Sequence, residues 1–106
     1  MTHGDDAAWA RFRDDMEAGR FFDAHEVLEE VWRTLDRGSP KAQALQGLIQ
    51  GAVALEHERR GRPDRGARVA RKAVPKLSGV GEIGGFDADK LRRRLIAMIA
   101  AETTMP

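Results

Sequence analysis

The chain contains no cysteine, which excludes disulfide scaffolds, thiolate zinc sites, iron–sulfur clusters and cysteine nucleophiles. It also lacks long apolar runs, and none approaches the roughly 18 residues that a membrane-spanning helix needs. The first residues, MTHGDDAAWARFRDD, contain no apolar stretch of the kind that a signal peptide requires. We therefore expect no membrane segment and a cytoplasmic location.

Signals for β-strands are nearly absent. There is no tyrosine, threonine is scarce, and no stretch alternates strictly between apolar and polar residues. Of the 106 residues, 42% are hydrophobic and 33% are charged, which is typical of a globular domain rather than of a disordered chain. The length suits one domain, so we expect a single all-α domain over residues 1–106.

Periodicity and helix-ending residues predict a compact bundle of five helices. Gly19 and Gly38 mark helix ends, and Ser39 followed by Pro40 is a favoured helix start. Residues 78–86 hold four glycines and are predicted to form a loop. The predicted helices span about residues 5–18, 21–37, 39–60, 63–77 and 87–102.

The short link near Gly38 folds the third predicted helix back along the second, as an antiparallel hairpin. This pairing would place His25 near Gly51 and Glu29 near Gly47. Glycine inside a helix costs about 1 kcal/mol relative to alanine, so a repeated glycine indicates close packing. The predicted stripe of small residues for this close helix contact comprises Ala44, Gly47 and Gly51.

Polar residues interrupt the apolar faces of these two helices. His25 lies within an apolar face, and Glu29 follows it one turn later, a spacing at which two side chains can hydrogen-bond. Glu56 falls in the middle of an apolar stripe, where a carboxylate needs a partner because an unpaired buried charge is costly. Gln46 and Gln50 lie beside the glycines.

Three interpretations of this polar cluster remain open. A metal site could use His25, Glu29 and Glu56, but HExxE lacks the second histidine of HExxH, and the Glu-x-x-His order of di-iron bundles is absent. Acid–base catalysis could use His25 and Glu29, although no nucleophile, phosphate loop or oxyanion motif accompanies them. The favoured interpretation is a structural network in which His25 and Glu29 bond to each other and to the glutamines. It implies no cofactor and no metal.

The segments AHEVLEEVW (24–32) and LQGLIQGAVAL (45–55), followed by Gly66 and Ala67 in a basic helix, resemble the bacterial and archaeal family named domain of unknown function 309. The resemblance covers about residues 9–78. It implies a small all-helical protein and leaves the biochemical role open. The residues that match the family's marked positions are His25, Glu26, Glu29, Trp32, Gln46, Gly47 and Gln50.

Charge is distributed unevenly along a chain whose formal net charge is only +1. Residues 1–37 carry ten acidic and five basic side chains, whereas residues 59–76 carry eight basic side chains and one acidic one. The two segments can attract each other within one chain or between two copies. A basic helix face could also follow nucleic-acid phosphates, but no interleaved aromatic is available to stack on bases. This face comprises Arg65, Arg68, Lys72 and Lys76.

We therefore predict a non-catalytic helical domain that acts by association, as a homodimer. Large aromatic side chains are numerous for so short a chain, and they would mark an interface if they formed an exposed patch. The alternative is a small metal-binding or hydrolase-like protein that uses His25 and Glu29, and a weaker one is nucleic-acid binding through the basic face. The aromatic residues are Trp9, Phe12, Phe21, Phe22, Trp32 and Phe86.

Overall fold

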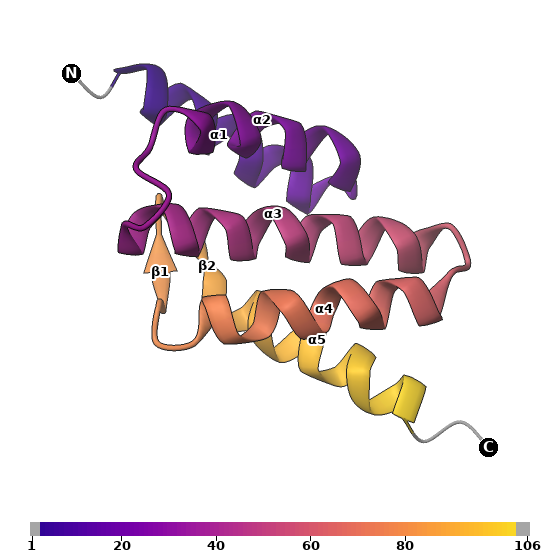
Figure 1. The fold of residues 1–106 in the computed structure, drawn as a ribbon. Helices are drawn as coiled ribbons and strands as arrows, with labels where there is room; N and C mark the ends of the chain where they lie inside the picture. The colour runs from indigo at the N-terminus through magenta and orange to yellow at the C-terminus, as the bar shows by residue number, and fades with distance from the viewer. Residues whose placement is uncertain (1–2, 104–106) are drawn as a thin grey trace.

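The computed structural model describes residues 3–103 as five α-helices and one short β-hairpin (Figure 1). The helices are α1 (His3–Glu17), α2 (Phe21–Arg33), α3 (Pro40–Arg59), α4 (Pro63–Leu77) and α5 (Ala88–Thr103). The strands are β1 (Glu82–Ile83) and β2 (Phe86–Asp87). The predicted all-α class and the five predicted helices are confirmed. Within the described residues, no helix has both the length and the apolar character that crossing a membrane requires.

Helix α3 runs through the middle of the molecule and separates two layers (Figure 1). On one side, α1 packs against α2, and α2 packs against α3 as the predicted hairpin. On the other side, α4 packs against both α3 and α5. Full burial of a large apolar side chain contributes about 1.5–3 kcal/mol, and the largest fully buried side chains come from every helix. They are Phe12, Leu28, Leu45, Leu48, Leu77 and Leu95.

Helix α2 ends a turn earlier than predicted. The backbone N–H groups of Thr34 and Leu35 donate to carbonyls three residues back rather than four, which tightens the last turn. The Thr34 hydroxyl also donates to the carbonyl of Val31 at 2.7 Å, and such local bonds compete with continuation of a helix. The next helix starts as predicted, because Ser39 Oγ accepts the N–H of Ala42 at 3.1 Å as its N-cap.

The predicted loop over residues 78–86 contains a β-hairpin instead. Its strands pair antiparallel, with Ile83 opposite Phe86. Gly84 and Gly85 form the turn with φ angles of +58° and +72°, the left-handed region that both central residues of a type I′ hairpin turn occupy. The prediction of a strandless loop is therefore wrong. The adjacent glycines Gly84 and Gly85 are the one sequence feature that indicates a hairpin turn here. The strands themselves could not be recognised, because two residues are too few to show an alternation of apolar and polar side chains.

The glycines of α3 face the α4–α5 layer. A Cβ added at Gly47 would lie 2.9 Å from Leu77 Cδ2 of α4, and one added at Gly51 would lie 2.9 Å from Leu91 Cδ2 of α5. These nearest neighbours differ from the predicted ones, His25 and Glu29 of α2. The reason is that α3 is buried on two sides, so its small residues serve a different packing face from the one that meets α2.

Candidate functional site

The residues of the predicted polar cluster bond to different partners and form no shared network. Glu29 Oε1 accepts from Arg33 Nη2 at 2.8 Å, and His25 Nδ1 contacts the carbonyl oxygen of Phe22 in its own helix. The predicted hydrogen bond between His25 and Glu29 is therefore wrong. The physical reason is competition, because the guanidinium of Arg33 offers Glu29 a charge-assisted bond and the carbonyl of Phe22 is the partner of His25 Nδ1.

One of the two glutamines predicted to complete this network bonds across the other interface of α3. Gln50 Oε1 accepts from Lys76 Nζ at 2.9 Å, and this ammonium also donates to the carbonyl of Lys72 at 3.2 Å. Lys76 is consequently half-buried between α3 and α4. It does not belong to the exposed basic face on which the sequence placed it. Trp32, another family position, lies beneath the guanidinium of Arg37, 4.2 Å from the ring centroid.

Glu56 is buried, with 8% of its surface exposed, and it has the partners that its position in an apolar stripe requires. Arg59 donates to both carboxylate oxygens, at 2.9 and 2.7 Å, and Arg60 Nε donates at 2.5 Å. The hydrogen bond from Arg59 has the largest effect on the pKa of Glu56. Together with the bond from Arg60 it lowers this pKa to about 2, although burial alone would raise it. The prediction that Glu56 needs a partner is confirmed.

The metal-site candidates are held apart by these separate bonds. His25, Glu29 and Glu56 each have a different nearest polar partner. Across residues 3–103, no group of three or more histidine, aspartate or glutamate side chains is arranged to hold a metal ion.

His25 and Glu56 nevertheless share one cavity, which we name the α2–α3 cavity. It has a volume of about 240 Å³ and lies where the first turn of α2 meets the end of α3. Nothing in the sequence groups the other lining residues with His25 and Glu56, because they come from three separate segments and follow no common spacing. The full lining set is Phe22, His25, Val53, Glu56, His57, Arg60 and Arg62.

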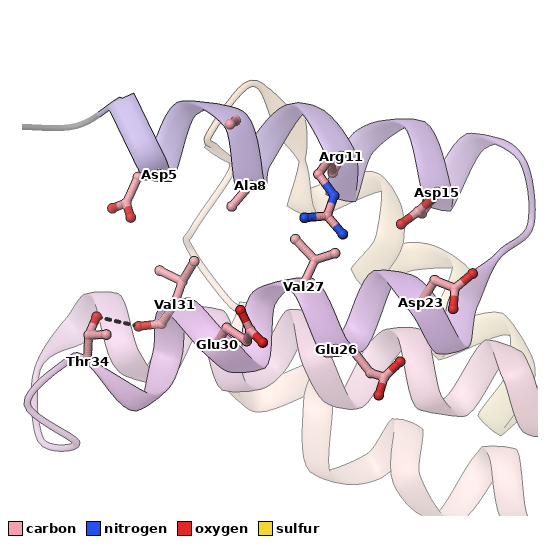
Figure 2. A pocket seen from close by; sticks show the side chains of 11 residues that line it. Asp5, Ala8, Arg11, Asp15, Asp23, Glu26, Val27, Glu30, Val31 and Thr34 are labelled. Atoms are coloured by element: carbon pink, nitrogen blue, oxygen red, sulfur yellow. Dashed lines mark hydrogen bonds between the residues drawn. The ribbon is translucent and has the colours of Figure 1, made fainter.

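A larger groove of about 670 Å³ runs between α1 and α2 (Figure 2). Its walls include the apolar side chains of Val27 and Val31 and one cation, Arg11. Five carboxylates from the two helices surround these residues, so we name this feature the acidic groove. The carboxylates belong to Asp5, Asp15, Asp23, Glu26 and Glu30.

The carboxylates of α2 in the acidic groove form no ion pair within residues 3–103, although Arg11 lines the same groove. Those on α1 are paired: Asp15 with Arg20 at 2.9 Å and Asp5 with Lys41 at 3.4 Å. In contrast, three exposed carboxylates of α2 form no ion pair with any residue of the described chain. They are Asp23, Glu26 and Glu30.

Helix α4 presents the opposite charge on the other side of the molecule. Its exposed cations, which we name the basic face, form no ion pair within residues 3–103. Helix α4 lies on one side of α3, and α1 and α2, which line the acidic groove, lie on the other (Figure 1). No ion pair in the described structure joins the acidic N-terminal segment to α4. The basic face keeps three residues of the predicted set and gains Arg71, so that it comprises Arg65, Arg68, Arg71 and Lys72.

The aromatic patch that supported the homodimer prediction is not present. Trp9 and Phe12 are buried, and most of the other aromatic side chains pack partly buried against the core. Phe22 is the exception, with 52% of its surface exposed. Apart from Phe22, these aromatic side chains are buried or partly buried because they pack against the core. The homodimer therefore stays a prediction, without an aromatic patch to support it.

Comparison with known proteins gives the chain a family. The model of the domain of unknown function (DUF309) matches residues 9–69. The chain belongs to this family. The resemblance expected from the sequence is confirmed, and so is the fold, because the crystal structure of a conserved hypothetical protein from Thermus thermophilus superimposes with a TM-score of 0.68. That match is 37% identical and covers 82% of this chain and 94% of the Thermus chain.

A second protein that this chain resembles is much longer. An uncharacterized protein of Aquifex aeolicus (strain VF5) is 41% identical over 56 residues, which are 53% of this chain. The matched segment makes up only 16% of the Aquifex protein. A similar sequence thus makes up nearly all of the Thermus chain and only a small part of the Aquifex protein.

Proposed function

We propose that this DUF309 chain is a helical interaction domain that associates with further copies of itself head to tail. The basic face of α4 in one copy lies in the acidic groove of the next. The observation that carries this proposal is the set of unpaired charges of opposite sign on opposite sides of α3. A cytoplasmic location is part of the same proposal, and cell fractionation tests it.

The placement of the two charged surfaces supports a head-to-tail assembly over a two-fold dimer. A two-fold dimer joins the same patch on both copies, and either surface used in this way would bring like charges together. A contact between unlike surfaces on opposite sides of the molecule is heterologous, and it produces a closed ring or an open chain. The sequence predicted a homodimer, and we propose a head-to-tail assembly in its place.

The energetics require more than isolated ion pairs. An exposed ion pair contributes about 0–1 kcal/mol, so three or four of them give weak binding. The acidic groove adds Val27 and Val31, which are largely buried already and form an apolar wall between the carboxylates. The arginine side chains of the basic face have long apolar stems that can cover this wall. A similar segment within the longer Aquifex protein supports the proposal of an interaction module.

Sedimentation velocity tests the proposal through its dependence on salt. At tens of micromolar and about 20 mM salt we expect species larger than the 11.8 kDa monomer, and at about 500 mM salt we expect the monomer alone, because salt screens exposed charges. The combined variant Asp23→Asn, Glu26→Gln and Glu30→Gln should weaken association about tenfold.

A matched control isolates the acidic groove from net charge. The variant Asp14→Asn, Glu17→Gln and Glu82→Gln makes the same three chemical changes at exposed acidic residues outside the acidic groove. It should associate like the unmodified protein. A monomer at every concentration in low salt would contradict the proposal, and so would an equal loss of association in both variants.

A further inference from the structure

The α2–α3 cavity lies outside both surfaces of the proposed assembly, and it contains an arginine without a partner. Arg62 is half-buried at the start of α4 and lines this cavity. Its side chain makes no hydrogen bond or ion pair within residues 3–103, whereas the neighbouring Arg60 is bonded to Glu56. Arg62 therefore offers its guanidinium donors to the cavity.

The carboxylate in this cavity does not neutralise Arg62. Arg59 and Arg60 already occupy the oxygens of Glu56. Those bonds hold the pKa of Glu56 at about 2, so its carboxylate is negatively charged at neutral pH. The two positive charges of Arg59 and Arg60 already exceed this single negative charge. Adding Arg62 leaves the surroundings of the cavity with a net positive charge. A positively charged, partly enclosed site favours an anionic ligand.

An exposed aromatic ring stands at the same cavity. Phe22 is 52% exposed, and its ring meets that of His25 edge to face with centroids 4.8 Å apart. Val53 adds a second apolar surface to the lining. Small-molecule sites combine apolar walls with a few polar groups that fix orientation, and this cavity has both.

The two histidines complete the polar lining. A carbonyl oxygen can only accept a hydrogen bond, so His25 Nδ1 carries the proton in its contact with the carbonyl of Phe22. Nε2 of His25 forms no hydrogen bond within residues 3–103 and is therefore available to a ligand. His57 also lines the cavity, and its side chain has no partner within residues 3–103.

We propose that the α2–α3 cavity binds a small organic oxyanion, a carboxylate or a phosphate ester with a compact apolar body. Arg62 binds the oxyanion, and Phe22 and Val53 contact the apolar body. The volume of about 240 Å³ restricts the ligand to one ring or a short chain. This binding does not depend on head-to-tail association, because none of the cavity residues belongs to the basic face or the acidic groove.

Titration followed by ¹H–¹⁵N NMR tests this site with four probes. Phenyl phosphate and benzoate contain both an oxyanion and an apolar ring. Inorganic phosphate contains only the oxyanion, and benzyl alcohol contains the ring without an oxyanion. At least one of the first two should produce saturable shifts at the cavity residues, with about tenfold tighter binding than either partial probe. The preference between phenyl phosphate and benzoate identifies the oxyanion.

Variants distinguish the site from general attraction to a basic protein. Arg62→Ala should weaken binding of the preferred probe about tenfold, and Phe22→Ala should weaken it several-fold. Arg65→Ala removes an exposed, unpaired arginine three residues further on and should leave binding unchanged. Arg62→Gln keeps much of the side-chain volume and should match Arg62→Ala, so that a folding defect in one variant does not decide the result.

Three outcomes would overturn this proposal. The first is the absence of saturable shifts up to about 10 mM of phenyl phosphate and benzoate. The second is an equal loss of affinity in Arg65→Ala and Arg62→Ala. The third is inorganic phosphate binding as tightly as phenyl phosphate, because the apolar wall would then have no role.

Discussion

The indole ring of Trp9 in α1 lies directly against Gly84 at the tip of the hairpin. A Cβ added to Gly84 would lie 2.0 Å from Trp9 Cδ2, a distance that no side chain can occupy. The guanidinium of Arg13 donates to the carbonyl of the same glycine, and Phe12 meets Phe86 with ring centroids 4.9 Å apart. These contacts join α1 to the hairpin that precedes α5, so they tie the first helix to the last part of the fold.

Replacing Gly84 with alanine should destabilise the protein strongly. The φ angle of +58° costs an alanine about 1–2 kcal/mol, and displacement of Trp9 costs about 1–3 kcal/mol more. Urea denaturation measures the loss. Gly79→Ala is the control, because Gly79 has a φ angle of +77° but nothing within 4 Å of an added Cβ. Equal losses in the two variants would show that Trp9 does not pack on Gly84.

Helix α4 approaches α3 closely at Gly66. An alanine Cβ there would lie 2.9 Å from the backbone oxygen of Ala54, which cannot move without moving α3. Alanine normally stabilises a helix by about 1 kcal/mol relative to glycine, but we expect Gly66→Ala to lower the free energy of unfolding by about 1–3 kcal/mol.

Gly51 provides the comparison for this prediction. Its added Cβ would meet Leu91 Cδ2 at the same 2.9 Å, but this atom is the end of a flexible side chain. Gly51→Ala should therefore cost less than Gly66→Ala in thermal unfolding. A Gly66→Ala variant more stable than the unmodified protein would contradict the close approach of α4 to α3.

The ion pairs of Glu56 should stabilise the fold more than an exposed pair does. Glu56→Gln removes the charge that Arg59 and Arg60 bind, and hydrogen bonds to charged groups contribute about 1.5–3 kcal/mol. Glu29→Gln makes the same change in a more exposed pair with Arg33, which contributes about 0.5 kcal/mol. Chemical denaturation of both variants at neutral pH measures the difference. Equal losses would mean that burial of Glu56 has no energetic effect.

The lowered pKa of Glu56 also predicts how stability depends on pH. The unfolded chain binds a proton at this carboxyl near its ordinary pKa of 4.5, whereas the folded protein binds it only near 2. The stabilising contribution is therefore complete above about pH 5 and is lost as the pH falls from 4.5 to 2. Denaturation curves at several pH values should show a smaller acid-induced loss in Glu56→Gln. An unchanged slope in that variant would contradict the assignment.

The sequence predicted the helices well because the signals for them are local. Ser39 and Pro40 start α3, and Gly19 follows α1, as capping preferences require. Glu56 was also correctly expected to have a partner, because its place in an apolar stripe implies burial. Each of these inferences depends on residues within one or two helical turns.

Features that depend on competition or on distant contacts were not predictable in the same way. His25 and Glu29 have a suitable spacing, but nothing in the spacing shows that Arg33 and the Phe22 carbonyl are better partners. The α2–α3 cavity depends on Arg62, which joins it only because the chain turns after α3. The exposure of each aromatic was likewise decided by tertiary packing.

Head-to-tail association is tested most directly by mixing two charge-reversed variants. Arg65→Glu, Arg68→Glu and Lys72→Glu make the basic face acidic, and Asp23→Lys, Glu26→Lys and Glu30→Lys make the acidic groove basic. Each variant alone presents surfaces of one sign and should sediment as an 11.8 kDa monomer in about 20 mM salt. An equimolar mixture should form larger species that dissociate in about 500 mM salt. A mixture that sediments only as monomers, under conditions in which the unmodified protein associates, would contradict the pairing of the basic face with the acidic groove.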